Sequence, residues 1–360
     1  MAKIVSVVGN RPQYVKAAPL CVALAARADI IGIDTGQHYD HELSQLFYDE
    51  LGIAPPTHRL KVGSGSHAEM TARILERIEP VLISEAPDWC VVYGDTNSTL
   101  AAALAAAKLG IPIAHVEAGL RSFDRSMPEE INRVVADRLS NVLLCPSNVA
   151  RRNLAGEGIT EGVHVVGDVM ADAARLFGPI AERSTVLDDL GVEDGGYALA
   201  TIHREANTRQ PSLGRLVEAL SALDTDVLLP LHPRTKAALE REGLAFGGRV
   251  RVLAPVGYLE FTALLRGARV LLTDSGGAQK EAYFQHVPCI TLRDRTEWVE
   301  TVEAEANRLV GDDAARIAAA VSAPPVPVAW PPLYGDGHAA ERIADVLLGE
   351  SAQPHDLSGR

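Results

Sequence analysis

Short runs of apolar and β-branched residues alternate with longer amphipathic or Ala-rich stretches along the whole of this 360-residue chain. This alternation constrains the fold more than any other feature, because repeated strand and helix patterns are typical of parallel sheets covered by helices. The chain is also too long for one ordinary hydrophobic core. The sequence therefore predicts an α/β protein with two doubly wound, Rossmann-like parallel-sheet domains.

The candidate strands fall into two series that are separated by a polar stretch. The first series covers residues 4–8, 30–34, 90–93, 113–116, 142–145 and 163–166. The second covers residues 197–202, 227–229, 250–253, 270–273 and 289–292. Residues 183–196 are polar and end in two glycines, which indicates a linker. We accordingly expect an N-terminal domain of residues 1–180 and a C-terminal domain of residues 181–360, whose final helix can pack back on the first domain.

Composition narrows the function classes. No apolar run is long enough to cross a bilayer, and Met1 leads almost directly into the first strand, so we expect a cytoplasmic protein without a signal peptide. The net charge is −13 and the lysines and arginines are scattered, which argues against a nucleic-acid partner. The four cysteines form no CxxC pair, so we interpret them as buried thiols that make neither disulfides nor a metal site.

Three carboxylates follow strands or begin helices in the first domain. Asp95 follows strand 90–93, Glu117 follows strand 113–116, and Glu129 comes directly after Pro128. Asp95 could be a helix N-cap and Glu129 a first-turn residue that stabilises the helix dipole, but Glu117 has no such structural explanation. Since ligands bind beyond the carboxyl ends of parallel strands, we expect the three to meet in one cleft. Glu117 is then the leading candidate for acid–base chemistry.

Basic and imidazole side chains occupy comparable positions. Arg11 and Lys16 follow the first strand, without the GxGxxG fingerprint of a dinucleotide site. His203 ends the first strand of the second series, and His232 follows the next strand. A single histidine is more often structural than catalytic, so the prediction depends on the whole group. We expect an anion-binding wall that also includes Arg121, Arg125, Arg133, Arg204 and Arg234.

Residues 270–282 read as a strand, a Ser-Gly-Gly turn and a helix. Backbone N–H groups and the positive end of the helix dipole can bind a phosphate at such a turn, although a plain tight turn would use the same residues. Ser275 and Gly276 are the candidate phosphate contacts. Glu281 lies about one helical turn further on, where its carboxylate could accept hydrogen bonds from ribose hydroxyls. Together these residues predict a site for a nucleoside diphosphate.

These segments together resemble the UDP-N-acetylglucosamine 2-epimerase family over nearly the whole chain. The resemblance is carried by residues 9–16, 35–38, 94–99, 115–121, 128–133, 203–204, 274–277 and 334–337. It implies a GT-B fold with two Rossmann-like domains that close on a UDP-sugar, a homodimer, and no metal, nicotinamide or other cofactor. It also implies a non-hydrolysing reaction that interconverts UDP-N-acetylglucosamine and UDP-N-acetylmannosamine by elimination and re-addition of UDP.

The resemblance extends to individual residues. Four match the family's catalytic positions: Asp95, Glu117, Glu129 and His203. Those that match its UDP contacts are Arg11, Ser275, Gly276, Gly277 and Glu281. The further substrate-binding candidates are Lys16, Arg133, His232 and Arg293.

Several positions depart from the family pattern. Asn10, Gln13 and Ala206 stand where many members have threonine, glutamate and glutamate. The variant with Asn10 and Gln13, together with residues 293–298, resembles a branch that includes UDP-2,3-diacetamido-glucuronate 2-epimerases, so that sugar is an alternative substrate. Three further alternatives are a hydrolysing 2-epimerase, a GT-B glycosyltransferase and a non-catalytic UDP-sugar sensor.

One loop concerns regulation. Many bacterial members resemble one another in a Gln-His-Arg segment that binds a second UDP-N-acetylglucosamine as an activator. Here Tyr39 and Asp40 follow Gln37 and His38, so a guanidinium is absent and a negative charge is added. We therefore expect this activator site to be weak or missing, unless other arginines such as Arg73 bind the activator.

Overall fold

The computed structural model describes residues 1–36 and 52–350, so the loop around Tyr39 lies outside the described residues. The chain divides into two compact units, Met1–Leu176 with Tyr334–Arg360, and Phe177–Leu333. The C-terminal domain expected at residues 181–360 is therefore too long at its end, since the chain returns to the first unit at Tyr334. The expected linker of residues 183–196 belongs to the second unit and contains α8 (Val186–Leu190).

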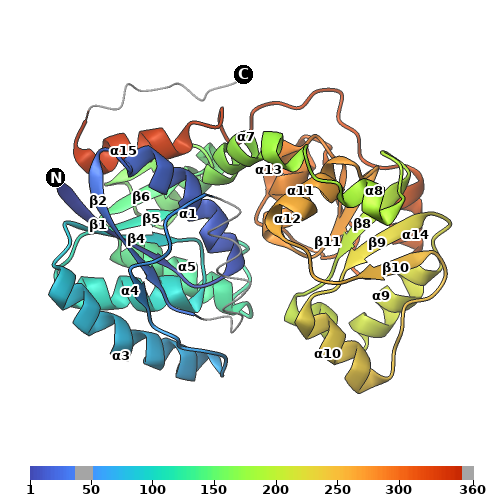
Figure 1. The fold of residues 1–360 in the computed structure, drawn as a ribbon, viewed down its shortest axis with the longest axis horizontal. Coiled ribbons are helices and arrows are strands. Elements are labelled where there is room, and N and C mark those ends of the chain that lie inside the picture. The colour runs from blue at the N-terminus through green and yellow to red at the C-terminus, as the bar shows by residue number, and fades with distance from the viewer. Residues whose placement is uncertain (37–51, 351–360) are drawn as a thin grey trace. The chain divides into compact units, whose positions relative to one another are not determined.

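A parallel sheet forms the centre of the first unit (Figure 1). In the described part of this unit it has seven strands in the order β3-β2-β1-β4-β5-β6-β7. The strands are β1 (Ala2–Val8), β2 (Ala28–Asp34), β3 (His58–Arg59), β4 (Trp89–Tyr93), β5 (Ile113–Val116), β6 (Val142–Cys145) and β7 (Val163–Val165). The near-continuous apolar sequences of β4, β5 and β6 fit the centre of a sheet that is buried on both faces.

Helices cover both faces of this sheet, with α3, α4 and α5 on one face and α1 and α15 on the other (Figure 1). The helices of this unit are α1 (Arg11–Leu24), α3 (His67–Glu85), α4 (Asn97–Lys108), α5 (Pro128–Leu139), α6 (Asn148–Gly156), α7 (Val169–Ala181) and α15 (Ala339–Leu348). The Ala-rich α4 buries most of its small side chains against the strands, which brings its backbone close to the sheet. Helix α7 contains the point at which the chain passes to the second unit.

The second unit repeats this plan around a parallel sheet in the order β10-β9-β8-β11-β12-β13. Its strands are β8 (Tyr197–Thr201), β9 (Asp226–Pro230), β10 (Val250–Leu253), β11 (Val270–Thr273), β12 (Cys289–Thr291) and β13 (Asn307–Leu309). Helices α9 and α14 pack on one face, and α8, α11 and α12 on the other. The remaining elements are η1 (Glu205–Thr208), α9 (Ser212–Ser221), α10 (Pro233–Glu242), α11 (Tyr258–Arg266), α12 (Gly276–Phe284), α13 (Val299–Glu303) and α14 (Ala314–Ser322).

The two-sheet prediction is confirmed, and every strand expected from the sequence is present. Strands β3 and β13 were not expected, because they are only two and three residues long and lie at the sheet edges. In each sheet the strand order reverses once, between β1 and β4 and between β8 and β11. Such switch points open a crevice at the carboxyl ends of the strands. The candidate residues after these four strands therefore lie where ligands bind in this fold class.

The C-terminal segment is fixed to the first unit by backbone contacts. The Asp168 amide donates to the Tyr334 carbonyl at 2.9 Å, and the buried Asp172 carboxylate accepts from the Ala339 and Ala340 amides at 3.0 and 2.8 Å. Burial raises the pKa of Asp172, although these two hydrogen bonds oppose the shift. The glycine-rich segment 334–337 thus has a structural explanation, because it joins α15 to the turn before α7.

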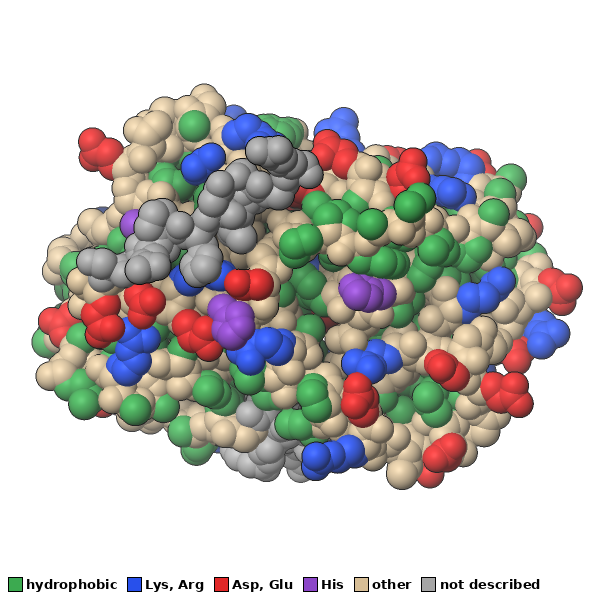
Figure 2. Space-filling model, turned by 90° about the horizontal axis from the view of Figure 1, so that it is seen from above, with side chains coloured by type: hydrophobic (Ala, Val, Ile, Leu, Met, Phe, Trp, Pro, Cys, Tyr) green, Lys and Arg blue, Asp and Glu red, His purple; other side chains and the backbone are tan. Residues whose placement is uncertain are grey.

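The remaining composition-based expectations concern thiols and the surface. Cys90, Cys145 and Cys289 are buried free thiols, whereas Cys21 is half-buried. Burial raises the pKa of Cys90 and of Cys289 to about 12. On the face drawn in Figure 2, acidic and basic side chains are interspersed. Among the described helices, none combines the length and apolarity that a bilayer crossing requires.

Candidate active site

Two of the predicted catalytic carboxylates follow neighbouring strands of the first sheet. Asp95 comes two residues after β4, and Glu117 comes directly after β5. Glu117 is 7% exposed and has a φ of 72°, a left-handed conformation that is uncommon for a residue with a side chain. Such strained and buried carboxylates occur mostly at functional sites. The sequence predicted a partly buried carboxylate at Glu117, and the structure shows it to be buried.

Lys16 forms an ion pair with Glu117, and both side chains are largely buried. Helix α1 carries Lys16 one turn beyond the end of β1, which places its ammonium group near the loops that follow β4 and β5. Gly94 has a φ of 60°, and a Cβ atom there would lie 3.1 Å from both Lys16 Nζ and Glu117 Oε2. A side chain at this position would be strained by the backbone conformation and would push the two charged groups by a few tenths of an ångström.

Arg133 connects Asp95 to a second, buried carboxylate. Its guanidinium forms an ion pair with Asp95 through Nη2 and donates to Glu130 Oε2 through Nη1 at 2.9 Å. Arg133 was predicted to bind an anionic substrate. The structure places it between two carboxylates of its own unit, where it holds the Asp95 side chain in position.

Glu130 shapes the loop between β5 and α5. Its carboxylate accepts from the Ser122 amide, the Ser122 hydroxyl and the Phe123 amide, each at 2.9 Å. It is 4% exposed, whereas Glu129 lies half-buried in the first turn of α5. Glu129 was the predicted site residue of this pair and Glu130 was not predicted, because adjacent glutamates in a first helical turn cannot be told apart by pattern alone.

Gln13 was also missed, although it fastens three elements together. Its Oε1 accepts from the Gly9 amide at 2.9 Å, and its Nε2 donates to the Tyr93 carbonyl at 2.7 Å and to the Thr96 hydroxyl at 2.9 Å. These bonds tie the loop after β1 to the end of β4. Arg11, the first residue of α1, is half-buried at the same strand ends.

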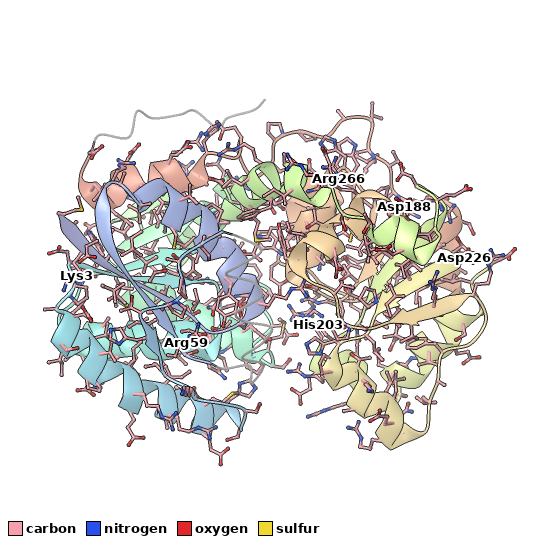
Figure 3. All side chains as sticks on the ribbon, viewed as in Figure 1. Lys3, Arg59, Asp188, His203, Asp226 and Arg266 are labelled. Carbon is pink, nitrogen blue, oxygen red and sulfur yellow. The ribbon has the colours of Figure 1, made fainter. Side chains whose placement is uncertain are left out.

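In the second unit, the buried Asp274 organises the loop after β8. Its carboxylate accepts from the His203 amide at 3.1 Å, the Arg204 amide at 3.0 Å and Asn207 Nδ2 at 3.1 Å. His203 Nδ1 lies 3.4 Å from Asp274 Oδ1, and the imidazole remains partly exposed beyond the end of β8 (Figure 3). The His232 ring lies 5.5 Å from the His203 ring, between centroids. The structure thus brings together the two histidines that the sequence singled out.

The Ser-Gly-Gly segment begins a helix rather than forming a left-handed turn. Ser275 is the N-cap of α12, and its hydroxyl accepts from the Ala278 amide at 3.3 Å. Gly276 and Gly277 are the first two helical residues, and neither has a positive φ. The two glycines add no Cβ atoms to this helix start, which allows a phosphate to approach the backbone amides closely. Glu281 is half-buried in the next turn of α12.

Arg293 is held by a neighbouring carboxylate. Its guanidinium donates to Glu297 through Nη1 at 3.0 Å and through Nη2 at 3.1 Å, a bidentate pair that is largely buried. Arg204 Nη2 lies 3.8 Å from the same glutamate. Substrate binding by Arg293, as predicted, would involve a guanidinium already engaged with Glu297. Among the described residues, no cluster of three or more histidine, cysteine, aspartate or glutamate side chains is arranged to hold a metal ion.

Comparisons with known proteins identify a family and several relatives. The family model described as UDP-N-acetylglucosamine 2-epimerase matches residues 22–348. A UDP-N-acetylglucosamine 2-epimerase homolog from Methanococcus maripaludis is 46% identical over 353 residues, covering 96% of this chain and 99% of the relative. The UDP-2,3-diacetamido-2,3-dideoxy-D-glucuronate 2-epimerase of Pseudomonas aeruginosa is 47% identical over 356 residues, with the same coverage.

A solved structure supports the fold assignment. The crystal structure of the Methanocaldococcus jannaschii UDP-GlcNAc 2-epimerase in complex with UDP-GlcNAc and UDP matches with a TM-score of 0.91 at 42% sequence identity. The match covers 96% of this chain and 99% of that chain. The predicted GT-B fold is confirmed by this likeness.

Proposed function

Because the chain belongs to the UDP-N-acetylglucosamine 2-epimerase family, we propose that it interconverts UDP-N-acetylglucosamine and UDP-N-acetylmannosamine without hydrolysis. The observation that carries this proposal is the pairing of two carboxylates with buried cations at adjacent strand ends, Glu117 with Lys16 and Asp95 with Arg133. The C2 proton of an acetamido sugar is only weakly acidic. A site that removes it needs carboxylates in fixed positions and a way to stabilise the leaving group.

The proposed reaction has two halves. A carboxylate removes the C2 proton while the bond between C1 and the UDP oxygen breaks, and the electron pair of the C–H bond becomes the C1–C2 double bond of a 2-acetamidoglucal. A proton then returns to C2 on the opposite face, and the UDP oxygen bonds to C1 again. We assign proton transfer to Asp95, Glu117 and Glu129, and stabilisation of the leaving diphosphate to His203.

The second unit is the proposed nucleotide site. The start of α12, at Ser275, Gly276 and Gly277, offers backbone N–H groups and a positive helix end to the diphosphate. Glu281 is the proposed ribose contact, and Arg11 and His232 the proposed additional phosphate contacts. These assignments are supported by the chemistry of the residues and by their places at the strand ends.

Incubation with UDP-N-acetylglucosamine in heavy water tests the reaction. Proton NMR should show UDP-N-acetylmannosamine with deuterium at C2, and the same deuterium should wash into the recovered substrate. An epimer that keeps its C2 hydrogen would exclude the elimination mechanism. Accumulation of UDP and free N-acetylmannosamine would instead identify a hydrolysing enzyme, and transfer of the sugar to an acceptor a glycosyltransferase.

A second candidate substrate is UDP-2,3-diacetamido-glucuronate. It is supported by the 47% identity to the Pseudomonas aeruginosa enzyme named for that sugar. Parallel assays with both sugars decide between them, since the preferred substrate should have the higher kcat/KM. A specificity ratio above about tenfold for the glucuronate would replace the first assignment.

We also propose a cytoplasmic homodimer. Support comes from a largely apolar groove on the first unit between α3, α4 and α5, a face that a second copy could cover. Its apolar lining includes Ala68, Ala72, Leu75, Leu100, Pro128 and the exposed Ile131. Light scattering after size-exclusion chromatography should give twice the mass of the chain, and Ile131→Asp should shift the protein towards the monomer.

A further inference from the structure

His115 is fully buried in β5 and contacts hydrogen-bond acceptors through both ring nitrogens. Nδ1 lies 2.7 Å from Asp137 Oδ1, and Nε2 lies 2.7 Å from the Gly94 carbonyl oxygen. A carbonyl oxygen can only accept, so Nε2 must carry a proton. His115 therefore reaches from the strand that precedes Glu117 to the residue that precedes Asp95.

Asp137 is the second half of this network. It lies near the end of α5, fully buried, and its Oδ2 accepts from the Gly119 amide at 3.2 Å and from Arg121 Nη1 at 2.7 Å. Burial alone would raise the pKa of the Asp137 carboxyl, but the charges and hydrogen bonds of His115 and Arg121 hold it below its usual range. Both oxygens of this carboxylate therefore face the network, Oδ1 towards His115 and Oδ2 towards Gly119 and Arg121.

Arg121 anchors the network to the next helix. Its guanidinium donates to Glu157 through Nε at 2.6 Å and through Nη2 at 2.9 Å, and Glu157 directly follows α6. Gly119 has a φ of 80°, and a Cβ atom there would lie 2.5 Å from the Ala150 carbonyl oxygen. The loop from Glu117 to Arg121 is therefore held from both sides, by α5 and by α6.

We infer that His115 and Asp137 are positioning residues that fix the two loops carrying Asp95 and Glu117. His115 is hydrogen-bonded to the carbonyl oxygen of Gly94, the residue directly before Asp95. Asp137 accepts a hydrogen bond from the amide of Gly119, which is two residues beyond Glu117. This inference rests on the proposed catalytic roles of those two carboxylates. A displacement of reacting groups by about 1 Å can lower a rate by about a hundredfold, so loop position is a sufficient cause of a large effect.

Kinetics of His115→Gln and Asp137→Asn test the inference, after epimerisation by the wild-type enzyme has been established. We expect kcat to fall by about a hundredfold in each variant, with KM for the UDP-sugar and the affinity for UDP changed by less than about twofold. The matched control is Asp172→Asn, which alters a buried carboxylate that accepts two backbone amides elsewhere in the same unit. It should lose thermal stability and keep its kcat.

Two outcomes would overturn the inference. One is a wild-type kcat in the folded fraction of both variants. The other is an equal loss of kcat in Asp172→Asn, which would show that the loss comes from general destabilisation of the fold and not from the position of the two loops. Failure of the wild-type enzyme to epimerise would instead contradict the proposed function.

A spectroscopic measurement tests the network without any assay of turnover. In protein labelled with ¹⁵N-histidine, the resonances that disappear in His115→Gln belong to His115. Its Nε2 should have the chemical shift of a protonated nitrogen, because it faces the Gly94 carbonyl oxygen, which can only accept. A deprotonated Nε2 would contradict the arrangement on which the inference rests.

Discussion

The Lys16 ammonium group forms an ion pair with the Glu117 carboxylate, although the two residues are 101 positions apart in the chain. The pair exists because β1 and β5 lie on either side of β4, so that the segments after these strands meet at one edge of the sheet. A carboxylate this deeply buried needs a partner of opposite charge. Lys16 supplies one from within the same unit.

This pairing predicts non-additive kinetics. Glu117→Gln should lower kcat by about 10²–10⁴-fold if Glu117 transfers the C2 proton. Lys16→Met should have a comparable effect because it leaves Glu117 without its cation. The double variant should then be little slower than either single variant, since both substitutions disable the same unit. Steady-state kinetics of the four proteins provide the measurement, and fully multiplicative losses would show that the two residues act independently.

Gly94→Ala should damage the site by crowding. The added Cβ would lie 3.1 Å from both Lys16 Nζ and Glu117 Oε2, and the positive φ should cost roughly 1–2 kcal/mol of stability. Gly110→Ala is a matched control. Gly110 also has a positive φ, of 71°, but apart from its chain neighbours nothing lies within 4 Å of an added Cβ. Both variants should unfold at lower urea concentration. Only Gly94→Ala should lose activity, and similar activity in the two would count against steric crowding of the ion pair.

The sequence was sufficient to predict the parts of the fold that depend on local pattern. Alternating strand and helix signals predicted both sheets, and the residues after the strands predicted Asp95, Glu117, His203 and Ser275 as strand-end groups. The pattern could not predict β3 and β13, because segments of two or three residues carry no periodicity. It suggested that the final helix can pack back on the first domain, as α15 does, but could not show that the return begins at Tyr334, because this depends on tertiary contacts.

The residues that support the candidate site could not be predicted from the sequence for a different reason. Gln13, Glu130 and Asp137 are buried polar side chains whose function depends on partners brought close only by the fold. Gln13, for example, donates to the carbonyl oxygen of a residue 80 positions away. A glutamine or a second glutamate near a helix start has no distinctive pattern by itself. The candidate residues at the strand ends are therefore easier to predict than the residues that hold them in place.

Asp274→Ala should weaken UDP binding in the second unit. The fully buried carboxylate accepts from the His203 and Arg204 amides and from Asn207, and its loss would leave these donors unsatisfied at a cost of about 1–3 kcal/mol. Because Ser275 follows directly, the start of α12 should also move. Calorimetric titration should show UDP affinity reduced by about tenfold or more, which is about 1.4 kcal/mol.

Asp312→Asn is the control for that measurement. It removes an ion pair with Arg215 in the same unit, at the surface, where such pairs contribute little. UDP should bind to it as to the wild-type protein. If the UDP affinity of Asp274→Ala is also unchanged, the nucleotide does not bind at the loops that Asp274 organises.

The last prediction concerns acid stability and follows from Asp137. Burial tends to raise the pKa of its carboxyl, but His115 and Arg121 lower it more, so that the folded-state pKa lies below the unfolded value of about 3.9. A carboxyl group with a depressed folded-state pKa stabilises the native state fully above the unfolded pKa. That contribution is lost as the pH falls through the folded-state pKa.

The free energy of unfolding should therefore decrease below about pH 4 in the wild-type protein, and less steeply in Asp137→Asn. Urea unfolding between about pH 3 and pH 6 measures both slopes, with Asp172→Asn as the comparison, since the pKa of Asp172 is raised and its ionised form is the less favoured one in the fold. Equal slopes below pH 4 in the wild type and in Asp137→Asn would mean that the buried network does not hold Asp137 in its ionised form.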